Sequence, residues 1–410
     1  MNIRADADFI IQSALIAALP DTAVKKALAQ AQFGSGKLVL IAAGKAAWQM
    51  AKTASELLGN TLSGGVVITK YEHAKGDLPS LQIFEAGHPV PDENSFAATQ
   101  KAIDAVSGLS KEDTVLFLLS GGGSALFEKP LVSGEELADI TKQLLASGAD
   151  IVEMNTVRKR LSAVKGGRFA ALCAPAQVFA VVLSDIIGDP LDMIASGPAY
   201  PDTSTCAQAV AIAQKYHLKL SQEAEKFLRT ETPKTLSNVT TQVTGSVKQL
   251  CHAAEKACVA LGYTPIVLTA SLCCNARDAG SFLGSIAQYH QDSTHSLAFI
   301  AGGETVVQLK GKGLGGRNQE LALAAAPLLC GLENTAVFSI GSDGTDGPTD
   351  AAGGYCDTKT VENLAQQEID VSAVLADNDS YHALKACDGL LITGPTGTNV
   401  NDLSVLLIKR

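Results

Sequence analysis

Short, continuous runs of apolar residues recur along the chain, and each one ends in a glycine-rich turn that opens into a helical pattern. The runs lie at 37–45, 114–124, 178–189, 296–304, 335–347 and 389–397. Apolar runs of strand length that alternate with helices are typical of parallel sheets covered by helices on both faces. The pattern therefore predicts an α/β protein with mainly parallel, Rossmann-like sheets. Ligands of such sheets bind beyond the carboxyl ends of the strands, where these glycine turns fall.

A polar, threonine-rich stretch at 228–245 interrupts this pattern and is the best candidate for a domain boundary. With 410 residues, the chain is long enough for two domains of ordinary size. We therefore expect one domain over residues 1–235 and another over residues 236–410. The stretch itself is a candidate for a short strand hairpin between them.

The first residues of the chain predict an amphipathic helix rather than a signal peptide. Apolar residues recur there at helical spacing, namely Phe9, Ile10, Ala14, Leu15, Ala18 and Leu19. The longest apolar runs elsewhere are strand-sized and fall well short of the roughly 18 residues of a membrane span. We therefore expect a cytoplasmic protein that does not enter a membrane.

Composition and charge narrow the classes of protein further. Hydrophobic residues make up 46% of the chain and charged residues 18%, which excludes a disordered protein. The net charge of −10 argues against general affinity for nucleic acid or an anionic membrane. The nine cysteines include no C-x-x-C pair, so we expect reduced thiols.

A basic segment, RKRLSAVKGGR at 158–168, contains no acidic residue. Asn155 and Thr156, just ahead of it, are predicted to cap the N-terminus of a helix. Basic groups near a helix start favour the binding of carboxylate or phosphate. Asn155, Arg160 and Lys165 are therefore candidate substrate ligands, and the alternative is a solvated basic helix face.

Two turns that follow apolar runs carry anion-binding chemistry. The turn Ser120-Gly121-Gly122-Gly123-Ser124 frees backbone N–H groups to surround an anion, and its serines add donors. Lys45 follows the first apolar run beside the start of a helix, near the expected ligand crevice. The alternatives are a tight structural turn and an exposed lysine.

Two further loops carry carboxylates directly after apolar runs. Asp185 and Asp189 are suited to hold magnesium through water or to accept a hydroxyl proton, although Asp also forms ordinary turns. The glycine-rich segment 341–354 contains Asp343 and Asp346. It is either a ligand loop or an elaborate turn.

Gly311, Gly313 and Gly316 spell G-x-G-x-x-G, the glycine pattern of dinucleotide-binding sites. A dinucleotide site needs this pattern after the first strand of a β-α-β unit, with an acid about 20 residues later. Here the alternation VVQLKGKG predicts a hairpin strand instead. Arg317, at the opening of a predicted helix over 317–328, is the stronger candidate. No Walker A sequence occurs in the chain.

Nine segments, in order along nearly the whole chain, resemble the D-glycerate 2-kinases, the class II glycerate kinases with a C-terminal MOFRL domain. The segments are AAGKAA (42–47), GHPVPDENS (87–95), LLSGGGSALFEKP (118–130), MNTVRKRLSAVKGGR (154–168), LSDIIGDPLDMIASGP (183–198), GGETVV (302–307), GGRNQELAL (315–323), GSDGTDGPTDAAG (341–353) and GPTGTNVNDL (394–403). Residues 200–295 contain no segment that we can match.

The resemblance implies transfer of the γ-phosphoryl group of ATP to the 2-hydroxyl of D-glycerate, with Mg²⁺ present. It implies two α/β domains with the active site in the cleft between them. Lys45 and Arg317 are then the catalytic pair. Asp185 and Asp189 are the carboxylates nearest the magnesium, and Asp189 is also a candidate base for the hydroxyl proton.

The remaining site residues implied by the resemblance divide between the two substrates. The turn at 120–124, Arg160 and Lys165 would hold the glycerate carboxylate or share the phosphates. The nucleotide would be held by Gly302, Gly303, Glu304, Thr305, Gly341, Asp343, Gly344, Thr345, Asp346 and Gly347. The partner is a small molecule, and a homodimer is left open.

Two rival functions remain. A hydroxypyruvate reductase needs a nicotinamide site, for which only the misplaced G-x-G-x-x-G pattern speaks. A non-catalytic sensor of a sugar acid or nucleotide would bind without turnover. Both candidate catalytic residues, Lys45 and Arg317, are present, which favours the kinase.

Overall fold

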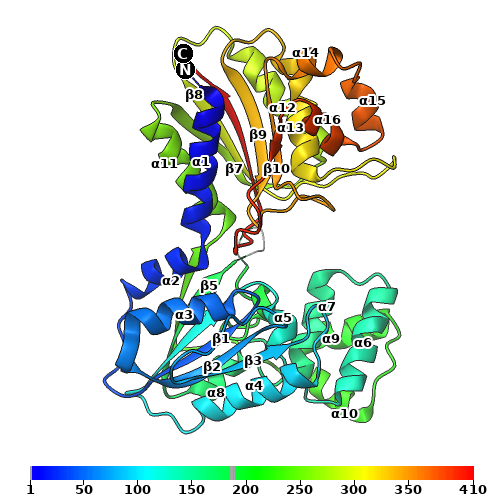
Figure 1. Cartoon of the computed structure of the whole chain (residues 1–410). Coiled ribbons are helices and arrows are strands. Elements are labelled where there is room, and N and C mark those ends of the chain that lie inside the picture. The colour runs from blue at the N-terminus through cyan, green and yellow to red at the C-terminus, as the bar shows by residue number, and fades with distance from the viewer. Residues whose placement is uncertain (1, 185–187, 189) are drawn as a thin grey trace. The chain divides into compact units, whose positions relative to one another are not determined.

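The computed structural model describes residues 2–184, 188 and 190–410, which form two compact units (Figure 1). We call residues 23–184 and 190–244 the Lys45 unit, and residues 2–22 and 245–410 the Arg317 unit. The division at 244/245 lies nine residues beyond the expected one at 235/236. The N-terminal helix also belongs to the unit that contains the C-terminus.

The Lys45 unit contains a sheet of six strands in the order β3-β2-β1-β4-β5-β6. The pairs between β1 and β2, β1 and β4, β2 and β3, and β4 and β5 are parallel, as the apolar runs predict. The strands are β1 (Leu38–Ala43), β2 (Leu62–Lys70), β3 (Leu81–Ala86), β4 (Thr114–Leu119), β5 (Gln177–Leu183) and β6 (Val239–Gly245). Every residue of β1 and β4 is buried, so these two strands form the centre of the sheet.

Edge strand β6 explains why the observed division lies later than expected. The threonine-rich stretch ends in this strand, which completes the first sheet before the chain leaves the unit. The predicted hairpin is thus a single edge strand.

The helices of the Lys45 unit connect and cover these strands. They are α2 (Pro20–Leu28), which starts in the other unit, α3 (Ala47–Leu58), α4 (Glu93–Val106), α5 (Gly123–Leu126), α6 (Gly134–Ala146), α7 (Ile151–Arg158), α8 (Arg168–Cys173), α9 (Cys206–Lys215) and α10 (Gln222–Leu228), with short 3-10 turns η1 (Gly59–Thr61), η2 (Lys159–Leu161) and η3 (Ile194–Ser196). The cap of α7 is Asp150, which exchanges hydrogen bonds with Glu153 in a capping box. The predicted cap at Asn155 is therefore wrong, because Asn155 and Thr156 lie inside the helix.

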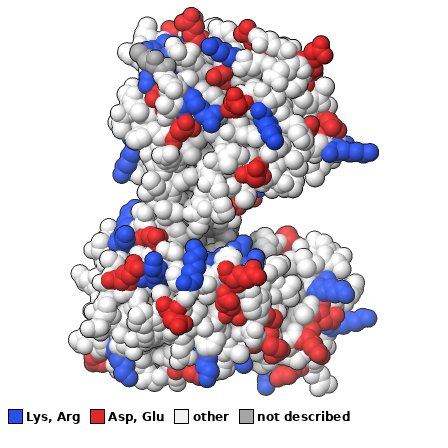
Figure 2. Space-filling model, in the orientation of Figure 1, with Lys and Arg blue, Asp and Glu red and all other residues white. Residues whose placement is uncertain are grey.

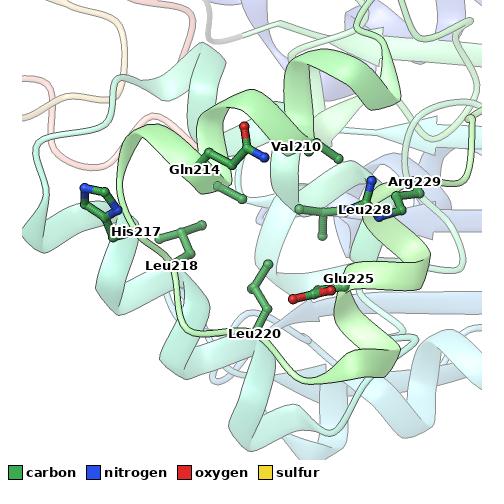
Figure 3. A pocket seen from close by; sticks show the side chains of 9 residues that line it. Val210, Gln214, His217, Leu218, Leu220, Glu225, Leu228 and Arg229 are labelled. Atoms are coloured by element: carbon green, nitrogen blue, oxygen red, sulfur yellow. The ribbon is translucent and has the colours of Figure 1, made fainter.

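Four of these helices, α6, α7, α9 and α10, pack around a small core of their own. This core includes Leu137, Ile140, Val157 and Leu228. A surface pocket of about 450 Å³ lies between α9 and α10, and Figure 3 shows the leucines and polar side chains that surround it. Helices α9 and α10 lie within residues 200–295, the segment in which no family motif is recognised.

The Arg317 unit contains a second sheet of six strands, in the order β11-β10-β9-β12-β8-β7. The strands are β7 (Thr264–Leu272), β8 (Leu297–Gly303), β9 (Thr335–Gly341), β10 (Gly353–Asp357), β11 (Leu390–Leu391) and β12 (Asp402–Ile408). The last strand, β12, inserts antiparallel between β8 and β9, which therefore run in the same direction. β10 also runs antiparallel to β9, so this sheet is mixed where the apolar runs predict parallel pairing.

The helices of the Arg317 unit are α1 (Ile3–Ala18), α11 (Val247–Ala260), α12 (Ala276–Tyr289), α13 (Arg317–Leu329), α14 (Thr360–Ala365), α15 (Val371–Ala376) and α16 (Ser380–Ala386). Helix α13 is buried along most of its length in the core of the unit. The α/β class and the layered arrangement of helices on sheets are thus confirmed.

Helix α1 is amphipathic as predicted, and it packs against α11 of the same unit (Figure 1). The carboxylate of Asp6 accepts hydrogen bonds from Tyr263 Oη (2.7 Å) and Lys409 Nζ (2.6 Å). The buried face follows Ile10, Ala14 and Ala18, whereas Phe9 is 46% exposed. The contacts tie the two ends of the chain to one unit.

The surface charges are mixed (Figure 2) and the cysteines are unpaired, as the composition predicts. Figure 2 shows basic and acidic side chains interspersed over the face in view. All nine cysteines are free. Among the described residues, no single helix is long and apolar enough to cross a membrane, and only the bent pair α1 and α2 together reaches the required length and composition.

Candidate active site

In the Lys45 unit, strand pairing brings the predicted lysine and the predicted serine-glycine turn together. Strands β1 and β4 are neighbours, so the turns that follow them meet at one edge of the sheet. The backbone N–H of Lys45 donates to the carbonyl of Gly121 (2.9 Å). The N–H of Ala46 donates to Ser120 Oγ (3.1 Å). The Lys45 side chain itself is exposed.

Two glycines allow this close approach. Gly44 has φ +126°, and a Cβ there would lie 2.2 Å from Ser120 Oγ. Gly122 has φ +85° at the start of α5, a conformation that L side chains rarely adopt. Gly44 and Gly122 are thus required by the backbone as well as suited to an anion.

The other end of the serine-glycine turn connects to Asn155 through an intermediate serine. Ser124 Oγ lies 3.2 Å from Ser196 Oγ, which donates to Asn155 Oδ1 at 3.0 Å. Ser196 and its neighbour Ala195 have φ +62° and +50°, a left-handed conformation that strains a residue with a side chain. Such strain is common where a functional group must be held in position.

The basic cluster divides into buried and accessible members. Arg160 is fully buried, and its guanidinium donates to the Thr156 carbonyl (2.7 Å) and to Ser204. Lys165 is also fully buried, and its Nζ donates to the carbonyls of Ser124 (2.7 Å) and Phe127 (3.2 Å). The structure does not support the predicted contact of these two side chains with substrate, because both are fully buried and most of their donors already bond acceptors within the protein.

Lys165 instead stabilises the serine-glycine turn from within the protein, through its hydrogen bond to the Ser124 carbonyl. Its Nζ lies 3.3 Å from the buried carboxylate of Glu128. Burial lowers the pKa of Lys165 to about 8, although the charge of Glu128 opposes the shift. Arg158 and Arg168 are the two cations of this segment that remain partly exposed, and Arg158 Nη2 lies 3.5 Å from the Ser124 carbonyl.

In the Arg317 unit, two carboxylates hold the predicted arginine in place. Arg317 opens α13, and its Nε and Nη2 donate to the two carboxylate oxygens of Asp402 (2.6 and 3.0 Å). Its Nη1 donates to Glu304 Oε1 at 2.8 Å. Burial alone would lower the pKa of Arg317, but the hydrogen bond and charge of Asp402 raise it, so the guanidinium stays charged.

A cleft of about 850 Å³ opens beside Arg317 and collects most of the predicted nucleotide ligands. Its walls include Glu304, Thr305, Asp343, Thr345, Asp346 and Gly347. The predicted glycines Gly302, Gly303, Gly341 and Gly344 are buried and do not line it. The structure therefore gives no support for direct contact of these four glycines with a nucleotide, and it shows that Gly303 allows close packing, since a Cβ there would lie 2.2 Å from a backbone oxygen.

Asp346 caps the start of α13 within this cleft. Its carboxylate accepts the backbone N–H groups of Asn318 (3.1 Å) and Gln319 (2.9 Å). Burial raises the pKa of Asp346 to about 6, although these backbone hydrogen bonds oppose the shift. Since a Cβ on Gly316 would lie 2.2 Å from this carboxyl group, only glycine fits before Arg317.

The G-x-G-x-x-G pattern lies in the wall of this cleft, but its first two glycines bond to a neighbouring loop. The backbone N–H of Gly311 donates to Asn378 Oδ1 (3.0 Å), and that of Gly313 donates to the Asp377 carbonyl (2.9 Å). These donors are therefore not available to a pyrophosphate. The predicted hairpin strand is also wrong, because the segment contributes only an isolated bridge at Val306.

Asp185 and Asp189 both lie outside the described residues. Within the described ranges, no group of three His, Cys, Asp or Glu side chains is arranged to hold a metal ion.

Asp402 is the main site residue that sequence reasoning missed. It lies at the start of β12 with its side chain 6% exposed, opposite both Gly303 and Gly341. An acidic residue that opens a mainly apolar strand is a detectable signal, because an unpaired charge is rarely buried. Its partner 85 positions earlier, however, comes only from the fold.

The geometry defines a class of protein: a two-unit α/β protein with anion-binding chemistry at the carboxyl ends of its strands. Residues 6–229 match a family described as a domain of unknown function, DUF4147, and residues 297–402 match the MOFRL family. The chain is 51% identical to a D-glycerate 2-kinase of Thermotoga maritima, over 97% of each chain. It is 41% identical to a protein of Agrobacterium vitis provisionally named hydroxypyruvate reductase, over 91% of this chain and 100% of that one.

A solved structure agrees with the sequence relatives. The crystal structure of glycerate kinase from Thermotoga maritima superposes with a TM-score of 0.95 at 50% identity, covering 98% of this chain and 99% of that one. The chain belongs to the glycerate 2-kinase family, and the resemblance inferred from its motifs is confirmed.

Proposed function

We propose that the protein is an ATP-dependent kinase that transfers the γ-phosphoryl group of ATP to the 2-hydroxyl of D-glycerate, giving 2-phosphoglycerate and ADP. The observation that carries the proposal is the 51% identity to a D-glycerate 2-kinase over 97% of each chain. Phosphoryl transfer needs positioning and charge neutralisation more than covalent chemistry, and the described residues offer both.

The cleft beside Arg317 is the proposed nucleotide site. Its volume of about 850 Å³ suits a nucleotide, and apolar Val306 and Leu309, 54% and 82% exposed, form part of its wall. Lys312, Arg317, Glu304 and Asp343 also line it. Arg317 already pairs with Glu304, so Asp343 is the carboxylate that would repel phosphates without a further cation. This favours a nucleotide that arrives with Mg²⁺, which supplies charge neutralisation when bound. Asp185 and Asp189 remain the proposed magnesium carboxylates.

The turns around Lys45 are the proposed site for the acceptor. The exposed ammonium lies beside a serine-glycine turn whose glycines leave room for an anion. We propose that Lys45 and Arg317 neutralise the charge that develops on the transferred phosphoryl group. Ser120–Ser124, Asn155 and Arg158 would hold the glycerate carboxylate, with Arg158 taking the place expected for Arg160.

The decisive experiment combines the purified protein with ATP, magnesium and D-glycerate, and adds enolase without phosphoglycerate mutase. Direct formation of phosphoenolpyruvate means that 2-phosphoglycerate was produced. Formation only after mutase is added would make the enzyme a 3-kinase and overturn the proposed position of transfer. No product in either case would overturn the kinase itself.

The same preparation tests the reductase alternative. Consumption of NADH or NADPH with hydroxypyruvate would support a reductase. We do not favour it, because the amides of the glycine pattern are already bonded to Asp377 and Asn378. A sensor would bind ATP or glycerate without forming product.

The remaining proposals concern the cellular location, the binding partners and the oligomeric state. We propose a cytoplasmic enzyme of a small-molecule substrate, consistent with the net charge of −10, that does not bind nucleic acid or membrane. A homodimer is tested by sedimentation of the purified chain.

A further inference from the structure

His88 belongs to the motif GHPVPDENS, to which neither the sequence nor the proposed function assigns a role. It follows β3, and its ring meets the turns that carry Lys45. A methyl group placed on Gly122 would lie 3.0 Å from His88 Cδ2, 3.2 Å from His88 Nε2 and 3.2 Å from Lys45 Cγ. The imidazole edge and the lysine stem therefore flank the same glycine, within one unit.

The ring nitrogens of His88 are open to a ligand. Neither nitrogen has a hydrogen-bond partner among the residues that the structure describes, although the ring is half-buried. By contrast, the nearby His73 uses Nδ1 at 3.1 Å from the Lys45 carbonyl. His88 thus keeps free the nitrogen that faces the serine-glycine turn.

The groups around His88 favour its uncharged form. Burial lowers its pKa below the usual 6.5, and the charges of Lys45, Lys70 and His73 lower it further. These groups come from the ends of β1 and β2, whereas the serine-glycine turn contributes no charge. Asp92, the carboxylate of the same segment, accepts hydrogen bonds from Tyr71 Oη (2.6 Å) and from the backbone N–H of Ser95. At neutral pH the imidazole can therefore accept a proton.

We propose that His88 is the general base that accepts the proton of the substrate hydroxyl during phosphoryl transfer. The inference rests on the proposed function, which places the acceptor at Lys45. The hydroxyl oxygen forms its bond to the γ-phosphorus as the bond from phosphorus to the bridging oxygen breaks. ADP leaves with that electron pair, the hydroxyl proton passes to the free imidazole nitrogen, and the resulting imidazolium later returns it to water.

This role separates His88, the proton acceptor, from Lys45, which stabilises negative charge. A lysine beside a base stabilises the oxygen from which the proton departs, and its charge also keeps the base unprotonated. A charged His88 that only binds phosphate would show the opposite dependence on pH. Asp189, the earlier candidate for the base, would then be left with the magnesium role.

The test compares His88→Gln and His88→Asn with wild type, using His217→Gln as the matched control. His217 is exposed in the same unit, at the pocket shown in Figure 3. General bases contribute about 10²- to 10⁴-fold, so we expect kcat to fall at least about a hundredfold in both His88 variants. The KM for D-glycerate should change only a few-fold, and His217→Gln should match wild type.

The pH profile distinguishes a base from a structural residue. Wild-type kcat should fall on acidification with a limb below pH 6.5, and this limb should be absent from the residual activity of the variants. The limb should coincide with the titration of the His88 ring followed by NMR, a measurement that needs no variant to fold. A variant that keeps the limb with near-normal kcat, or a wild-type kcat that rises on acidification, would overturn the base. Wild type that makes no 2-phosphoglycerate would overturn the proposed function as well.

Discussion

The replacement Lys165→Met tests whether this lysine supports the site or contacts the substrate. The change keeps a linear side chain of similar length but removes the charge. It removes the ammonium that lies 3.3 Å from the fully buried carboxylate of Glu128, and it removes the donor for the carbonyls of Ser124 and Phe127. Removing one partner of a buried ion pair costs about 3–5 kcal/mol. We expect the Lys45 unit to lose stability in that range.

The single tryptophan makes this loss measurable in one unit. Trp48 lies in α3 of the Lys45 unit, is 6% exposed, and donates from Nε1 to the Gly76 carbonyl at 2.8 Å. Its fluorescence during urea unfolding therefore reports on that unit. At about 3 kcal/mol per M of urea, the midpoint should fall by about 1–2 M.

Two controls separate the ion pair from general damage. Lys142→Met removes an exposed lysine of the same unit, and it should change stability by no more than about 0.5 kcal/mol. The double variant Glu128→Leu with Lys165→Met should recover part of the loss, because it no longer buries an unpaired charge. An unchanged midpoint for Lys165→Met, together with a many-fold rise in the KM for D-glycerate, would refute the reasoning and restore the substrate contact.

The remaining predictions concern the catalytic groups. Lys45→Ala should lower kcat at least about a hundredfold, as expected for the loss of a charge contact in the transition state; near-normal turnover of the folded variant would remove Lys45 from the mechanism. Arg317→Lys should be similarly severe in steady-state assays, because an ammonium cannot fork to Asp402 and reach Glu304 together; wild-type kinetics would contradict this. Asp189→Asn should raise the magnesium concentration needed for half-maximal rate, and an unchanged magnesium titration with lower kcat would point to a proton-transfer role.

Sequence reasoning located the turns of the site because they depend on local patterns. A run of apolar residues followed by glycines marks a buried strand and the turn after it, whatever the rest of the chain does. Lys45 and Ser120–Ser124 were found in this way, and their strands proved to be neighbours. Arg317 was found at a helix start for the same reason.

Sequence reasoning failed where the outcome depends on partners far along the chain. Arg160 and Lys165 look like ligands in a basic segment, but Ser204 and Glu128 occupy their donors inside the protein. The strand β12 is apolar like the others, yet only the assembled sheet sets it antiparallel between β8 and β9. The glycines at 311–316 match the dinucleotide-binding pattern, but in the structure the backbone N–H groups of Gly311 and Gly313 bond to the loop at 377–379.

The sequence by itself therefore determined the α/β class, the family and the turns that carry the candidate chemistry, since hydrophobic periodicity and glycine placement act over a few residues. Only the tertiary structure decided which charges are buried and which unit contains helix α1. It also decided that Arg317 pairs with Asp402. The physical reason is that burying a charge depends on a partner within hydrogen-bond distance. That partner can lie 85 residues away in the chain, as it does for Arg317.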